Sequence, residues 1–231
     1  MTEGTQAQAD GRAFVVPPHF NKNDAKVVAA GTPTQTGSAL LDYMAERIGL
    51  TDLSACDVLD FGCGSRFAEA IANGYPIRSY LGIDVDREMV DWINANVADP
   101  RVTLCWWNAR NPNYNPEGEP LSEETALPVD GRSFDIACMF SVITHQLPED
   151  ALIIFRLLRK HVRPRGHLFF SANIQEMAED YRELAPVPTG HSAYSLAALE
   201  RLLGQSGWRV LSVAPKRPKP GVWAQDTVLC A

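Results

Sequence analysis

The sequence predicts an α/β fold: a seven-stranded, mostly parallel sheet with a C-terminal antiparallel hairpin and helices on both faces. A glycine turn joins a strand-like apolar run, Val58 to Phe61, to a helix-like segment, Phe67 to Ala72, as in a βαβ unit. Strand-like and helix-like segments then alternate along most of the chain, which is typical of a parallel sheet. Two strand-like runs, residues 208–213 and 222–230, follow one another without a helix between them and predict the final hairpin.

The remaining elements follow from hydrophobic spacing. A helix is predicted over residues 38–50, where apolar side chains recur at helical intervals. The other segments have either a strand-like apolar run or a helical apolar set. Strands are predicted at residues 79–83, 102–107, 134–140 and 167–171, and helices at residues 87–97, 148–162 and from Ser195 to the residues before Gly207.

The 231 residues are enough for one well-filled domain and too few for two with a linker. Polar residues 1–12 predict a disordered tail, and residues 13–231 predict a single domain with an N-terminal cap segment, residues 13–50. Residues 110–133 and 173–192 predict two long loops, the second with one short helix. Because long loops often carry binding residues, we expect both to form substrate walls.

Composition and charge limit the partners. Hydrophobic residues at 45% and charged residues at 21% are typical of a soluble globular protein. The formal net charge of −7 argues against nucleic acid as a partner, since phosphate contacts need clustered cations. No apolar run approaches the roughly twenty residues that span a bilayer, and five cysteines without a Cys-x-x-Cys pair predict reduced thiols. We therefore expect a cytoplasmic protein with no membrane partner and, since its histidines are scattered, no metal site.

Gly62 and Gly64 form the turn on which the predicted site depends. Without side chains they let the backbone turn tightly and let a ligand approach, and the helix that follows offers unpaired N–H groups to an anion. The second strand ends in Asp84, whose carboxylate is placed to accept both hydroxyls of an adenosine ribose. Nicotinamide dinucleotide folds require a third glycine where this chain has Phe67, so the spacing disfavours an oxidoreductase of that type.

This stretch resembles the nucleotide-binding motif of class I S-adenosylmethionine-dependent methyltransferases, in which an acid lies two residues before Gly-x-Gly-x-Gly. Asp60, Gly62 and Gly64 match the motif, and Arg66 stands where the last glycine usually does. Arg66 either contacts the methionine carboxylate of the cofactor or points to solvent, and we favour solvent. The N-terminal elements either cover the cofactor, as the resemblance implies, or only cap the edge of the sheet.

Two further segments resemble the same family: residues 141–147, Ser-Val-Ile-Thr-His-Gln-Leu, and the turn at residues 163–166, Arg-Pro-Arg-Gly. The resemblance covers roughly residues 38–230 and implies the Rossmann-like methyltransferase fold with S-adenosyl-L-methionine as cofactor. It also implies that Asn108 holds the adenine amino group through its side-chain oxygen. The implied cofactor-binding residues are Asp60, Phe61, Gly62, Cys63, Gly64, Arg66, Asp84, Val85, Met89, Asn108, Ala109, Phe140 and Ser141.

Methyl transfer is a direct displacement, so positioning alone can supply roughly 7–11 kcal/mol. A general base adds about 10²–10⁴-fold when the acceptor is an unionised hydroxyl. His145, just past the fourth strand, is the candidate catalytic base, and His191 and His19 are weaker alternatives. Three tyrosines either shape an acceptor pocket or, as we favour, pack on the surface: Tyr114, Tyr181 and Tyr194.

The hypothesis is an S-adenosylmethionine-dependent methyltransferase that acts on a small-molecule or sugar acceptor, at oxygen. The alternative is a non-catalytic subunit that binds the cofactor or a partner protein. Two departures from the family motif, Arg66 and Asn108, favour that alternative.

Overall fold

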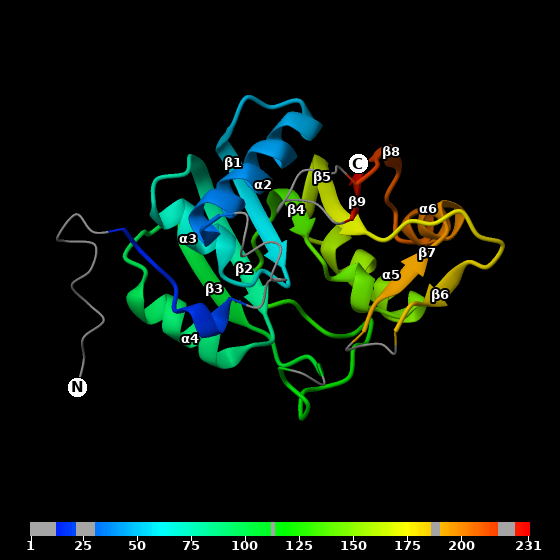
Figure 1. Cartoon of the computed structure of the whole chain (residues 1–231), viewed down its shortest axis with the longest axis horizontal. Helices are drawn as coiled ribbons and strands as arrows, with labels where there is room; N and C mark the ends of the chain where they lie inside the picture. The colour runs from blue at the N-terminus through cyan, green and yellow to red at the C-terminus, as the bar shows by residue number, and fades with distance from the viewer. Residues whose placement is uncertain (1–12, 22–30, 112–113, 186–189, 217–224) are drawn as a thin grey trace.

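The computed structural model describes residues 13–21, 31–111, 114–185, 190–216 and 225–231. Its centre is a seven-stranded sheet with the strand order β3-β2-β1-β4-β5-β9-β8 (Figure 1). Neighbouring strands from β3 to β5 are parallel, and β9 is antiparallel to both β5 and β8. The predicted fold class, with its C-terminal hairpin, is confirmed.

The elements of the sheet are bounded as follows: β1 Leu53–Phe61, β2 Ile77–Asp84, β3 Val102–Trp106, β4 Phe134–Met139, β5 Val162–Ala172, β8 Val210–Ala214 and β9 Asp226–Cys230. A separate two-stranded ribbon comprises β6 Tyr181–Glu183 and β7 Ser192–Tyr194. The helices are α2 Pro33–Ile48, α3 Arg66–Ala72, α4 Arg87–Asn96, α5 Pro148–Arg159 and α6 Leu196–Gln205, with short 3₁₀ turns η1 Pro18–Phe20 and η2 Ile143–His145.

Helices cover both faces of the sheet, as predicted. Val58 of β1 belongs to a core shared with α2, α3 and α4, whereas the adjacent Leu59 belongs to a core shared with α5 and α6. Because successive side chains of a strand point to opposite faces, these two cores lie on opposite sides of the sheet. A strand buried on both faces has a continuous apolar sequence, which explains the run that marks β1.

The N-terminal helix starts earlier than predicted, since α2 begins at Pro33 and not at residue 38. Thr32 and Gln35 form a capping box at its start. Gly37 lies inside the helix, where an added Cβ would come within 2.5 Å of the Arg66 carbonyl oxygen. The glycine is therefore a close contact between α2 and α3, although glycine disfavours a helix on propensity alone.

The boundary between α5 and β5 also differs from the prediction. The helix ends at Arg159 and the strand begins at Val162. The expected turn at residues 163–166 lies inside β5 as an irregularity, where the pairing with β4 shifts its register and Arg165 has a φ of 71°. Such a bulge keeps the strand continuous while it changes the strand's direction.

The short helix predicted around Met177 and Tyr181 is wrong. Tyr181 begins β6 and pairs with Tyr194 of β7. Tyr194 is fully buried, and its hydroxyl donates to the Gln146 carbonyl oxygen at 2.7 Å, so the prediction of a surface role for Tyr194 is also wrong. This pairing joins the two ends of a long loop and depends on contacts that a local pattern does not encode.

Two predictions fall on parts of the chain that the structure does not describe. They are the tail at residues 1–12 and the first residues of the last predicted strand, 222–224; β9 begins at Asp226. Within the described ranges, none of the helices is both long and apolar enough to cross a bilayer.

Asp57 of β1 is hydrogen-bonded to residues of three other strands, near the edge of the sheet where β2, β4 and β5 begin. Arg78 donates to both of its carboxylate oxygens at 2.9 and 2.7 Å, and Arg163 donates at 2.8 Å. The Asp57 N–H in turn donates to Asp135 at 2.8 Å. The hydrogen bond from Arg78, with the other bonds, holds the pKa of Asp57 well below its ordinary value of 3.8.

We expect Asp57→Asn to lower the free energy of unfolding by about 2 kcal/mol at pH 7, since hydrogen bonds to a charged group contribute roughly 1.5–3 kcal/mol. A depressed pKa stabilises the folded state above the unfolded-state pKa and loses that effect as the pH falls. The difference between wild type and variant should therefore shrink between about pH 4 and pH 2, as urea unfolding would measure. Asp180→Asn, which removes an exposed partner of Arg201, is the control and should change stability little. An Asp57→Asn effect that does not depend on pH would contradict this account.

Candidate functional site

A cleft of about 950 Å³ lies at the carboxyl ends of the parallel strands, at the upper end of the roughly 300–1,000 Å³ usual for ligand sites. All but one of the predicted site residues line it. They are Asp60, Phe61, Gly62, Cys63, Gly64, Arg66, Asp84, Val85, Met89, Ala109, Phe140, Ser141 and His145.

The glycine turn after β1 is held against the end of β2. The N–H groups of Gly62 and Cys63 both donate to the Ile83 carbonyl oxygen, at 2.8 and 3.1 Å. Gly62 and Gly64 have φ values of 70° and 54°, in the region that favours glycine. A Cβ at Gly62 would also come within 2.5 Å of the Val142 side chain, whereas around Gly64 nothing lies within 4 Å of that position. The turn is therefore tight at its first glycine and open at its second.

Gly82 of β2 makes room for the turn from the other side. A Cβ there would lie 2.7 Å from the Cys63 sulfur. Gly82 was not predicted to matter, because its contact depends on the register of β1 with β2. Burial, followed by the nearby Asp84 and Asp60 carboxylates, raises the pKa of the Cys63 thiol well above its ordinary value, so this thiol stays neutral.

Asp84 connects the end of β2 to the glycine turn. Its Oδ2 accepts from the Gly64 N–H at 2.9 Å and its Oδ1 from the Asp86 N–H at 3.0 Å. Burial raises its pKa, and the backbone N–H donors oppose that rise. Each carboxylate oxygen can accept more than one hydrogen bond, so the group can bind further donors in the cleft.

Asp60 is 2% exposed beneath the turn. The Tyr80 hydroxyl donates to Oδ2 at 2.9 Å, and the Cys138 thiol lies 3.5 Å from Oδ1. Burial raises the pKa of Asp60 to about 7, against the opposing effect of these hydrogen bonds. Arg66 also lines the cleft and is half-buried. Burial lowers the pKa of its guanidinium, and the nearby Asp60 carboxylate partly opposes that shift. The interpretation that Arg66 only points to solvent is therefore not supported.

Asp60 gives a pH-dependent stability. The folded state binds a proton up to about pH 7, whereas an unfolded aspartate releases it near pH 3.9. Stability should therefore fall as the pH rises between these values. We expect Asp60→Asn to remove this slope. The free energy of unfolding of the variant minus that of the wild type should therefore increase by on the order of 2–4 kcal/mol between pH 4.5 and pH 8. Urea unfolding over this range, with Asp130→Asn as control, measures the effect, and parallel curves for wild type and variant would refute it.

Asn108 is the predicted residue that does not line the cleft. Its side chain is exposed, and its oxygen accepts from Asn115 at 3.1 Å. Its neighbours Trp107 and Ala109 line the cleft instead, with the Trp107 ring 5.2 Å from the Phe61 ring. The strand ends one residue before Trp107, so which side chain turns inward depends on the loop and not on the strand pattern.

Ser141 has a φ of 59°, an uncommon conformation for a residue other than glycine. Its N–H donates to Ser171 Oγ at 2.8 Å, and the Ser171 hydroxyl donates to Gln225 Oε1 at 2.6 Å. Ser171 and Gln225 both line the cleft. Neither was predicted, because their proximity depends on the pairing of β5 with β9 across the sheet.

His145 lies in η2 and contacts the loop between β6 and β7. Its Nδ1 is hydrogen-bonded to the Gly190 carbonyl oxygen, and its ring lies 4.8 Å from that of His191. A carbonyl oxygen only accepts, so Nδ1 carries the proton and Nε2 is left with the lone pair. Burial lowers the pKa of His145, opposed by the bond to Gly190 and assisted by His191. His19 is exposed and does not line the cleft, whereas His191 does.

Three segments of the chain close the cleft, and both predicted loop walls are among them. Tyr114 and Leu121 come from the loop after β3, and Leu184 comes from the loop after β6. Phe20 and Leu40 come from the N-terminal segments.

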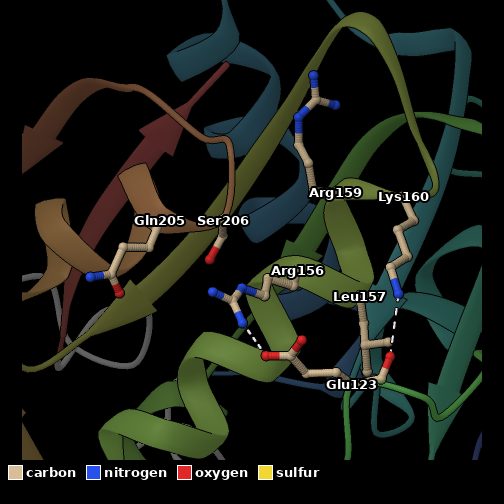
Figure 2. A pocket seen from close by; sticks show the side chains of 7 residues that line it. All are labelled: Glu123, Arg156, Leu157, Arg159, Lys160, Gln205 and Ser206. Atoms are coloured by element: carbon tan, nitrogen blue, oxygen red, sulfur yellow. Dashed lines mark hydrogen bonds and ion pairs between the residues drawn. The ribbon is translucent and has the colours of Figure 1, made fainter.

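A smaller hollow of about 290 Å³ lies beside α5 (Figure 2). Arg156 forms an ion pair with Glu123, and Lys160 donates to the Glu123 carbonyl oxygen at 3.4 Å. In Figure 2 Arg159 points away from that pair. Its guanidinium carbon lies 4.8 Å from the Trp208 ring centroid. These charges make contacts within the protein, so the hollow does not compete with the cleft as a site. Among the described residues, no three His, Cys, Asp or Glu side chains are grouped to hold a metal ion.

Comparison with known families and curated proteins finds methyltransferases. The profile of a methyltransferase domain family matches residues 25–213. The ribosomal protein L11 methyltransferase of Laribacter hongkongensis is 26% identical over 190 residues, 78% of this chain and 57% of that protein. The enzyme of the same name from Shewanella denitrificans is 29% identical over 156 residues, 68% of this chain and 46% of that protein. The chain spans about half the length of the curated relatives it matches.

Solved structures show the same fold at low sequence identity. The glycopeptide N-methyltransferase MtfA is 17% identical with a TM-score of 0.57, over 84% of this chain and 88% of that one. The CcbJ methyltransferase of Streptomyces caelestis is 13% identical with a TM-score of 0.58, over 94% and 96% of the two chains. MtfA structures hold S-adenosyl-L-methionine or sinefungin.

Proposed function

Because this chain belongs to the methyltransferase domain family, whose cofactor is S-adenosylmethionine, we propose that it methylates a small-molecule or sugar acceptor at oxygen. The observation that carries the proposal is His145, whose neutral ring lines the same cleft as the glycine turn and Asp84. A neutral histidine beside a cofactor site can serve as the general base that an unionised hydroxyl acceptor needs. The proposed site residues are those that line the cleft.

The residues present fit the cofactor. Gly64 has open space where a side chain would stand, and Asp84 retains acceptor capacity for ribose hydroxyls beside it. Arg66 and the N–H groups at the start of α3 are available to a carboxylate. When bound, S-adenosylmethionine would supply a methyl group on a positively charged sulfur. A nucleophilic oxygen can attack the methyl carbon, and the sulfur then leaves as a neutral thioether.

The protein's own part in this reaction is positioning and proton transfer. His145 Nε2 takes the proton of the acceptor hydroxyl, while the Gly190 carbonyl oxygen accepts from Nδ1 and stabilises the charged ring that results. Tyr114 and Leu184, from the loops after β3 and β6, line the cleft. We place the acceptor against these two side chains.

A second candidate is methylation of a protein acceptor. The match to ribosomal protein L11 methyltransferases favours it. The extent of the match, 57% of the length of the Laribacter hongkongensis enzyme, leaves nearly half of that enzyme without a counterpart here.

The test uses S-adenosylmethionine labelled in its methyl group with three acceptor panels: hydroxylated small molecules and sugars, small amines, and ribosomal proteins. We expect label in the first panel and loss of transfer in an Asp84→Ala variant. Label confined to ribosomal proteins would replace the proposal with the second candidate. Binding of S-adenosylhomocysteine without transfer to any panel would favour a non-catalytic cofactor-binding subunit.

A further inference from the structure

We propose that Glu69 is a positioning residue of the cofactor cleft: its buried carboxylate fastens two N-terminal segments to α3 and so places Phe20 and Leu40 over the cleft. The inference rests on the proposed function only for the identity of the cofactor.

Glu69 is 1% exposed on α3, and within the described residues the hydrogen bonds to its carboxylate come from the N-terminal segments. Its Oε2 accepts from the Val16 N–H at 2.9 Å, and its Oε1 accepts from the Thr34 N–H at 3.1 Å and the Thr34 hydroxyl at 2.8 Å. In the described chain, none of the hydrogen bonds to this carboxylate comes from a lysine or arginine. Since a buried charge must be compensated, the two N-terminal segments and the carboxylate depend on each other.

Asn73 repeats the arrangement one helical turn later. Its side-chain oxygen accepts from the Phe14 N–H at 2.9 Å, and its amide donates to the Phe14 carbonyl oxygen at 2.7 Å and to the Thr34 hydroxyl at 3.1 Å. Residues four apart share one face of a helix. One face of α3 therefore binds both the segment before η1 and the start of α2.

The segments held in this way carry the N-terminal wall of the cleft. Phe20 follows Val16 by four residues and Leu40 follows Thr34 by six, and these are the residues before position 50 that line the cleft in the described part of the chain. Phe20 is 3% exposed, with its ring 5.9 Å from Trp92 of α4. Because α4 begins directly after Asp84 to Asp86, Phe20 lies on the side of the cleft where the adenosine is proposed to bind.

Glu69 is also close in sequence to the glycine turn of the cleft. The helix α3 begins at Arg66, immediately after the glycine turn, so Glu69 lies in its first turn. A backbone N–H that loses its buried acceptor is destabilising, and in Glu69→Gln the amide nitrogen would face a donor on one side. The substitution is nearly isosteric and should loosen the N-terminal wall without emptying the core.

The test compares Glu69→Gln with the control Glu46→Gln, an exposed acid on α2, and with Phe20→Ala. For each we would measure the dissociation constant of S-adenosylhomocysteine by titration calorimetry, hydrogen exchange of residues 13–21 and 31–48, and the melting temperature. We expect Glu69→Gln to weaken binding about tenfold and to speed exchange in both segments. Phe20→Ala should weaken binding to a similar extent without faster exchange at residues 31–48.

Binding within twofold of wild type in either variant would overturn the inference, and so would unchanged exchange in Glu69→Gln. If Glu69→Gln does not fold, Thr34→Val, which removes one donor to the carboxylate, decides by the same measurements. Failure of the wild type to bind S-adenosylhomocysteine would instead overturn the proposed function, so the two failures are distinct.

Discussion

Replacing Asp84 with alanine is expected to weaken S-adenosylhomocysteine binding by at least about 100-fold. The carboxylate stands at the end of β2 beside the glycine turn and holds the Gly64 N–H at 2.9 Å. In the proposed complex it also accepts two ribose hydroxyls, and hydrogen bonds to a charged group contribute roughly 1.5–3 kcal/mol each. Losing two such bonds accounts for the expected change.

Titration calorimetry of the purified protein measures this effect, with Asp91→Ala as the matched control. Asp91 is an exposed acid of α4 whose contact is an ion pair with Arg87 at 3.5 Å, so its removal should leave the affinity unchanged. NADH serves as a ligand control and should not bind. An Asp84→Ala variant that is folded and binds as tightly as wild type would show that the ribose lies elsewhere.

Replacing His145 with glutamine is expected to lower kcat by about 10²–10⁴-fold on a hydroxyl acceptor identified by the panels, with little change in the KM for S-adenosylmethionine. Glutamine keeps a polar side chain of similar length but cannot take up a proton. His167→Gln is the control, because His167 lies on β5 and contacts the Cys230 carbonyl oxygen instead of lining the cleft.

The pH dependence of the wild type follows from the same residue. Burial holds the pKa of His145 below its ordinary value of 6.5, so the base form is present at lower pH than in an exposed histidine. The rate should rise with pH with its midpoint below about pH 6.5, and the variant should lack this rise. A variant that retains both the rate and the rise would assign the base to another group.

The parts of the site that could be predicted from sequence are local in the chain. Gly62, Gly64 and Asp84 follow strands whose apolar runs are unambiguous, and parallel strands bring their carboxyl ends together at one edge. The pairing of Asp60 with Gly82 and of Phe61 with Ile83 confirms that arrangement. The class of fold could be predicted for the same reason.

The parts that could not be predicted depend on contacts between distant segments. Ser171 meets Gln225 only because β9 lies beside β5. Asn108 accepts from Asn115, seven residues further along the loop, and does not line the cleft. Glu69 has an ordinary position on an apolar helix. Its proposed role depends on Thr34 and Val16, which lie 35 and 53 positions earlier in the chain.

The most direct test of the whole account is a crystal structure of the protein grown with S-adenosylhomocysteine. We expect the ribose hydroxyls on the Asp84 carboxylate, the amino-acid end at the turn of Gly62 to Arg66, and the sulfur on the side of the cleft that holds His145. Ligand bound outside the cleft, or an adenosine whose ribose does not reach Asp84, would contradict it.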